Sequence, residues 1–91
     1  MQAEQQGFAA NERHDYAAAR MHFLEAYSMS SQPQHAFSAA NMCLKIGTPE
    51  ALLEAKQHYQ QLERIALPNK VNRATARRFN HNAAWRLLNP G

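Results

Sequence analysis

Cysteine, glycine and proline are scarce in this 91-residue sequence, which contains one cysteine, three glycines and four prolines. The single cysteine, Cys43, excludes an internal disulfide and any zinc site built from several cysteines. Long apolar runs are missing too, because none approaches the roughly 18 residues that a membrane-spanning helix requires. The first residues also lack the basic-then-apolar order of a signal peptide. We therefore expect one small, soluble, cytoplasmic domain without a membrane partner.

Acidic residues are absent from the last part of the sequence. All seven lie before Arg64, although the net charge of the whole chain is +3. The segment after residue 69 carries only cations: Lys70, Arg73, Arg77, Arg78 and Arg86. Such a segment suits an acidic partner, either a carboxylate-rich peptide or a phosphate backbone. A solvated helix face explains the same pattern equally well.

Patterns that support catalysis are also missing. The sequence has no glycine-rich phosphate loop, nucleophile elbow or pair of catalytic carboxylates. No two of its five histidines have the i, i+4 spacing of a helical metal site with an acid or cysteine ligand nearby. Cys43 falls at a packing position, which favours a buried thiol over a nucleophile. We expect a non-enzymatic protein that needs no metal and no cofactor.

Good helix formers fill the stretches between the few glycines and prolines, which predicts an all-α fold. The predicted helices run from near the start to about Glu12, from Asp15 or Tyr16 to about Ser30, from Ser31 to Gly47, from Thr48 to about Leu67, and from Asn69 to near Asn89. Ser31 is expected to cap the third helix, with Pro33 in its first turn. Gly47 is expected to end that helix. The very short turns between helices predict antiparallel hairpins.

The chain also contains an internal repeat. Residues of the first predicted helix recur 33 positions later, in the pairs Gly7 and Ala40, Ala10 and Cys43, and His14 and Gly47. Residues of the second recur 36 positions later, in the pairs Ala19 and Ala55, Phe23 and Tyr59, and Ala26 and Leu62. A partial third copy follows at Ala76, Phe79 and Ala83. Small residues at such places allow two helices to approach to about 8 Å, so we expect these positions to pack inside the hairpins.

At these positions the sequence resembles the tetratricopeptide repeat (TPR) family, whose unit is a helical hairpin of about 34 residues. The stretch "HDYAAARMHFLEAY", residues 14–27, follows the family's order through Asp15, Tyr16, Ala19, Phe23 and Ala26. The second copy matches through Ala40, Gly47, Ala55, Tyr59 and Pro68, with three inserted residues and with Leu62 where alanine is usual. The resemblance implies a TPR-like α-solenoid made of a first hairpin over 1–31, a second over 32–67 and a capping helix over 68–91.

In TPR arrays the first helices of successive hairpins line a concave groove, so the resemblance implies a protein-binding module, either an adaptor or a chaperone. It assigns these residues to the groove: Glu4, Phe8, Asn11, Phe37, Asn41, Lys45, Lys70, Arg73, Arg77 and His81. Phe8 and Phe37 would anchor a peptide or an amphipathic helix, and the basic flank would bind its carboxylates. The first helix lacks the Lys and Asn of chaperone-docking members, so a two-carboxylate clamp is not expected.

Two further expectations concern the capping helix. Its residues Phe79, Ala83 and Leu87 are expected to face inward, whereas Trp85 and Leu88 lie on another flank. If exposed, that flank marks a dimer or partner contact; alternatively, it folds over the edge of the fourth helix. The competing function is nucleic-acid binding through the basic segment over 70–86, which would make affinity fall steeply with salt.

Overall fold

Five α-helices form the described part of the chain, which comprises residues 2–64 and 70–89 of the computed structural model. They are α1 (Gln2–Glu12), α2 (Tyr16–Ser30), α3 (Pro33–Ile46), α4 (Pro49–Arg64) and α5 (Lys70–Leu88). The side chains of residues 70–76, 79 and 80 lie outside this description. No strand occurs among the described residues, so the predicted all-α class is confirmed.

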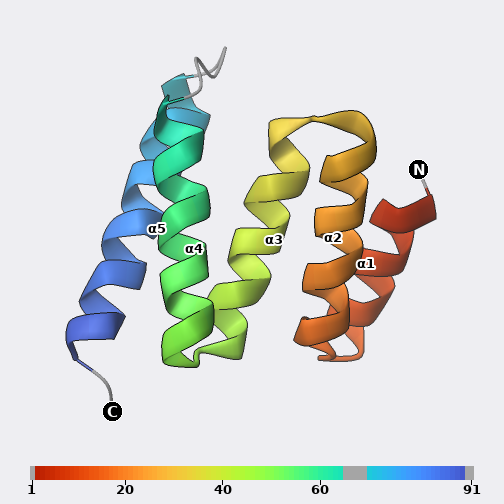
Figure 1. The fold of residues 1–91 in the computed structure, drawn as a ribbon, viewed down its shortest axis with the longest axis horizontal. Helices are drawn as coiled ribbons and strands as arrows, with labels where there is room; N and C mark the ends of the chain where they lie inside the picture. Colours follow the sequence, from red (N-terminus) through yellow and green to blue (C-terminus); the bar gives the residue numbers. More distant parts are fainter. Residues whose placement is uncertain (1, 65–69, 90–91) are drawn as a thin grey trace.

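The helices stand side by side, and each packs against its neighbour in sequence (Figure 1). α3 lies between the α1–α2 pair and the α4–α5 pair, and the two chain ends lie at opposite sides of the array. The molecule measures 36 × 32 × 17 Å. Its shortest dimension accommodates about two layers of helices, since packed helix axes lie about 8–10 Å apart.

The two turns within the hairpins are built alike. His14 and Gly47, which are 33 positions apart, both adopt left-handed backbone conformations, with φ of 62° and 77°. The next residue then caps the following helix: Asp15 Oδ1 accepts a hydrogen bond from Ala18 N, and Thr48 Oγ1 accepts one from Ala51 N, each at 3.2 Å. The predicted stop at Gly47 and start at Thr48 are therefore confirmed.

The turn between the hairpins corrects one prediction. Ser31 does not cap α3; it ends α2 with φ 57°, and its N–H donates to the Tyr27 carbonyl at 2.8 Å. A residue in the left-handed conformation cannot also adopt the extended conformation of an N-cap, so Gln32 takes that position without a side-chain bond. Pro33 begins α3 as predicted. The predicted helix boundaries at Leu67, Pro68 and Asn69 lie outside the described residues.

The repeated small and aromatic residues form the core. The buried repeat positions are Gly7, Ala10, Ala19, Phe23, Ala26, Ala40, Cys43, Ala55, Tyr59, Leu62 and Ala83. At Gly7 the two helices of the first hairpin approach so closely that an added Cβ would lie 2.8 Å from Cε1 of Phe23. On α5, Ala83 is fully buried and Leu87 packs partly against the core, as expected. The prediction that Phe79 faces inward concerns a side chain that lies outside the described part of the structure.

Candidate binding groove

A groove of about 410 Å³ lies between α1 and α3. Its lining consists of Phe8, Asn11, Phe23, Ser38, Asn41, Met42, Leu44 and Lys45, and we call it the α1–α3 groove. Phe23 and Met42 are almost fully buried, so they form an apolar base. The volume lies in the range of known ligand sites, about 300–1,000 Å³. A groove of this size can hold several side chains of a peptide.

Phe8 is the exposed apolar residue of this groove. Its ring packs edge-on against Phe23, with centroids 5.2 Å apart and an interplanar angle of 76°. Half of the residue, 50%, nevertheless remains exposed. The edge-to-face contact fixes the orientation of the ring before any ligand arrives. Phe8 can therefore act as an apolar anchor that loses little conformational freedom on binding.

The polar side chains of the groove are held in one orientation by contacts within the protein. Lys45 Nζ donates to Asn11 Oδ1 at 2.9 Å and lies 5.3 Å from the centroid of the Tyr16 ring. Asn41 Oδ1 accepts a 2.6 Å hydrogen bond from the Tyr59 hydroxyl. Both amide oxygens are thus engaged, and among the described residues neither amide NH₂ group has a hydrogen-bond acceptor. Because an amide nitrogen and an ammonium group only donate, these groups are suited to carboxylate or carbonyl oxygens.

The structure brings together four of the ten residues assigned to the groove: Phe8, Asn11, Asn41 and Lys45. Glu4 and Phe37 do not line it, and Phe37 instead packs against Tyr59 with a centroid distance of 5.6 Å. Arg77 is a residue of α5 whose side chain lies near the end of α4, with its Nε 3.9 Å from Glu63 Oε1.

The remaining predicted residues lie on α5. His81 is exposed. The side chains of Lys70 and Arg73 are outside the described residues. Trp85 and Leu88 are 62% and 81% exposed, so the alternative in which they fold over the edge of α4 is wrong.

A polar cluster between α2, α3 and α4 was not foreseen. Both oxygens of Glu54 accept hydrogen bonds from Arg20, at 2.7 and 2.5 Å. The Cys43 thiol donates to Glu54 Oε2 at 3.2 Å, and His58 Nε2 lies 3.1 Å from the same oxygen. The i, i+4 spacing of Glu54 and His58 is visible in the sequence. Arg20 is 34 positions away from Glu54 and carries no comparable local signal.

Electrostatics in this cluster favour a structural role. The Arg20 hydrogen bonds lower the pKa of Glu54 to about 2, and the same bonds raise the pKa of Arg20. Burial, followed by the nearby carboxylate, raises the pKa of Cys43 to about 12. Cys43 is therefore a neutral thiol at neutral pH, which makes it a poor nucleophile. Among the described residues, no group of three His, Cys, Asp or Glu side chains is placed to hold a metal ion.

Comparison of the chain with protein-family models, curated proteins and solved structures gave no match. Within residues 2–64 and 70–89, no helix is both long and apolar enough to cross a membrane.

Proposed function

We propose that this chain is a non-enzymatic, cytoplasmic protein-interaction module of the TPR type, an adaptor or chaperone that binds an acidic or amphipathic peptide in the α1–α3 groove. The observation that carries this proposal is the pairing of the exposed Phe8 ring with oriented donors on Asn11, Asn41 and Lys45. An apolar anchor beside several donors matches a peptide that carries both an apolar side chain and carboxylates.

The relation between the two hairpins supports the TPR type. Phe8 packs against Phe23 in the first hairpin, and the corresponding residues of the second, Asn41 and Tyr59, are joined by a 2.6 Å hydrogen bond. An aromatic contact in one copy is thus replaced by a hydrogen bond at the same place in the other. The same two helix faces meet in both hairpins, which is what a structural repeat requires.

Charge in the groove supports an acidic ligand. Lys45 is exposed and supplies the positive charge among the residues that line the groove. Its ammonium group lies over the Tyr16 ring and donates to Asn11, and these two contacts limit its motion. A carboxylate that accepts from Lys45 and from the Asn41 amide would be recognised through charge-assisted hydrogen bonds. Carbonyl groups of an extended peptide could accept from the same donors.

The nucleic-acid alternative rests on the cations of α5, two of which also make contacts within the protein. Arg86 Nη1 donates to the Leu44 carbonyl at 2.8 Å, and Arg77 faces Glu63. Arg86 therefore helps to hold α5 against α3, whereas Arg77 is 77% exposed and makes only a long ion pair, which contributes little.

Peptide selection tests the proposal directly. We expect a displayed random-peptide library to yield sequences that combine Asp or Glu with a large apolar residue. Calorimetry should then show that Phe8→Ala and Lys45→Glu each weaken binding at least about tenfold, or about 1.4 kcal/mol. Met21, which is 65% exposed on α2, provides a matched control because Met21→Ala should leave the affinity unchanged.

Two results would contradict the proposal. One is a set of selected peptides whose affinity does not depend on Phe8 or Lys45. The other is an affinity that falls with salt as steeply as phosphate-driven binding does, since a peptide with an apolar anchor keeps much of its affinity.

A further inference from the structure

The outer face of α5 carries a continuous row of exposed residues. Arg78, His81, Trp85 and Leu88 are separated by three, four and three positions, so they share one side of the helix. All four are exposed, and Trp85 and Leu88 reach 62% and 81%. The buried Ala83 is two positions from Trp85 and faces the core instead. The row therefore presents Arg78 and His81 in the middle of α5 and two large apolar side chains, Trp85 and Leu88, toward its C-terminal end.

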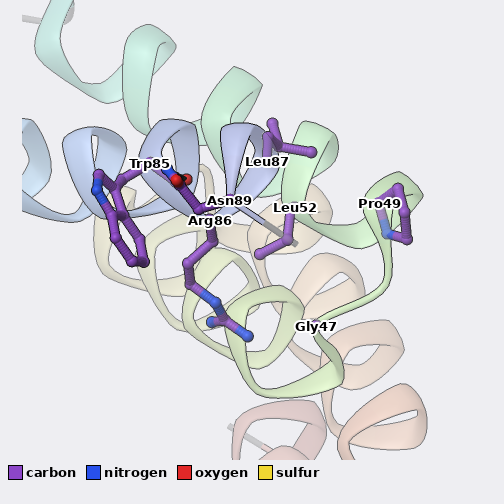
Figure 2. Close-up of a pocket in the computed structure, with 7 residues that line it drawn as sticks. All are labelled: Gly47, Pro49, Leu52, Trp85, Arg86, Leu87 and Asn89. Atoms are coloured by element: carbon purple, nitrogen blue, oxygen red, sulfur yellow. Dashed lines mark hydrogen bonds between the residues drawn. The ribbon is translucent and has the colours of Figure 1, made fainter. Parts of the chain in front are cut away.

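A second groove lies beside the apolar end of this row. It has a volume of about 370 Å³ and lies between the end of α5 and the α3–α4 turn. Leu52, Leu87 and Pro49 give it an apolar lining, and Trp85 contributes to the wall formed by α5 (Figure 2). We call it the α5 groove. Because its volume is near the small end of known ligand sites, it suits a few inserted side chains of a protein.

Arg86 adds a fixed positive charge to the α5 groove. Figure 2 shows its side chain reaching from α5 toward Gly47, close to Trp85. The hydrogen bond from Nη1 to the Leu44 carbonyl, 2.8 Å long, holds the guanidinium in that orientation. A guanidinium has five N–H donors, and this bond uses one of them. Arg86 can therefore bind a carboxylate while it remains attached to α3.

Charge decides which occupant fits. The segment from residue 69 to 91 contains five cations and no acid. If the α5 faces of two copies met, the like charges of Arg78 and Arg86 in both copies would repel each other, whereas an acidic helix would be attracted. We propose that the α5 groove and its exposed row bind an acidic amphipathic helix of another protein. Its apolar side chains contact Trp85, Leu88 and the groove, and its carboxylates pair with Arg78 and Arg86.

This surface is separate from the α1–α3 groove, with which it shares no lining residue. The inference therefore does not depend on the proposed function, and variants can distinguish the two. Leu88→Asp alters the α5 surface, whereas Phe8→Ala alters the α1–α3 groove. Met29→Asp is a matched control for Leu88→Asp, since Met29 is an apolar residue of α2 that is 68% exposed.

Trp85 is the only tryptophan of the chain, so tryptophan fluorescence reports on this surface. The probe is a synthetic amphipathic peptide of about 18 residues, long enough to form a helix, with leucines spaced three and four apart and glutamates on the other positions. One control peptide carries lysine in place of glutamate. A second has the acidic composition in scrambled order, without an apolar face.

We expect the acidic peptide to shift the Trp85 emission to shorter wavelength in a saturable titration. The lysine and scrambled peptides should bind at least tenfold more weakly. Leu88→Asp and Arg78→Glu should each weaken the binding of the acidic peptide at least tenfold, while Met29→Asp leaves the affinity that Trp85 reports unchanged.

Several results would overturn the inference. One is a Trp85 emission that stays unchanged at peptide concentrations up to about 1 mM. The others are equal responses to all three peptides and a Leu88→Asp variant that binds the acidic peptide as tightly as the original protein.

Other results would identify a different occupant or site. A shift in Trp85 emission that appears with protein concentration alone, together with a dimer in sedimentation, would identify a second copy as the occupant. Tighter binding of a DNA or RNA oligonucleotide than of the acidic peptide would identify a nucleic acid. A response lost in Phe8→Ala but retained in Leu88→Asp would assign the peptide to the α1–α3 groove.

Discussion

Arg20 on α2 binds Glu54 on α4 through two hydrogen bonds, from Nε to Oε2 at 2.7 Å and from Nη2 to Oε1 at 2.5 Å. This bidentate pair links the second helices of the two hairpins directly. The Cys43 thiol of α3 donates to the same carboxylate at 3.2 Å. One acidic side chain thus connects three helices, and its charge contributes to the packing of the first hairpin against the second.

Glu54→Gln should destabilise the fold by about 1 to 2 kcal/mol at neutral pH, because Arg20 loses a charged partner in a partly buried site. The Arg20 and Glu54 side chains are 32% and 27% exposed, so solvent screening keeps the effect moderate. Urea unfolding followed by circular dichroism measures the change. Glu12→Gln, at an exposed position, is the control and should have little effect.

The same carboxylate should make stability depend on pH. The folded-state pKa of Glu54 is about 2, below its ordinary value of 4.5. A lowered pKa means that the stabilisation is complete above about pH 4.5 and is lost as the pH falls toward 2. Unfolding free energies measured across this range should decline less steeply for Glu54→Gln than for the unmodified protein. Parallel curves for the two proteins would contradict the assignment.

Gly7→Ala should destabilise the protein by about 1 to 2 kcal/mol. The added Cβ would lie 2.8 to 2.9 Å from three carbons of the Phe23 ring, which is itself only 1% exposed and cannot move aside. This overpacking outweighs the gain of about 0.5–1 kcal/mol that alanine brings to a helix. At the exposed Ala9 of the same helix, Ala9→Gly should also destabilise, by about 0.5–1 kcal/mol. Thermal unfolding tests both variants, and a Gly7→Ala protein more stable than the original would refute the close contact.

Gly47→Ala should destabilise by about 1 to 2 kcal/mol, since a side chain is unfavourable in the left-handed conformation that ends α3. Its φ is 77°, and a Cβ would also lie 3.0 Å from Arg86 Nη2. The equivalent residue of the first hairpin is His14, with φ 62°. His14→Gly should therefore be neutral or slightly stabilising in the same denaturation assay. If His14→Gly destabilised the protein more than Gly47→Ala, backbone conformation would not be what controls the stability of the turns.

Cys43 should react with thiol reagents only when the protein opens. Its side chain is fully buried, and its pKa is raised to about 12 by burial and by the Glu54 carboxylate. At pH 8 we expect labelling by an aromatic disulfide to be at least about a hundredfold slower than for a free cysteine. The rate should rise with urea as the opened population grows. Rapid labelling without denaturant would show that the thiol is accessible.

Much of the fold could be predicted because its signals are local. Pro33, Gly47 and Pro49 act within one turn of the chain, and they ended or started helices where expected. Ser31 was assigned to the wrong helix end because serine is suited to an N-cap and also tolerated in the left-handed turn. The choice between these roles depends on where α2 stops.

The candidate groove was predicted only in part. Phe8, Asn11, Asn41 and Lys45 line one groove, since α1 and α3 occupy equivalent places in the repeat. Phe37 was placed there by the same argument, but it packs against Tyr59. Helical spacing identifies the face of a residue and does not specify which neighbour its side chain contacts.

The sequence by itself determined the helices, most of their described ends and the small residues through which each hairpin closes, because these depend on backbone conformation and on side-chain size within a few turns. Only the tertiary structure decided the contacts between the hairpins. Arg20 with Glu54 and Lys45 with Asn11 each join residues 34 positions apart, and Arg86 reaches a carbonyl 42 positions away. Such pairs form only when packing fixes the rotation and separation of whole helices, and those quantities are set by the summed contacts of the core.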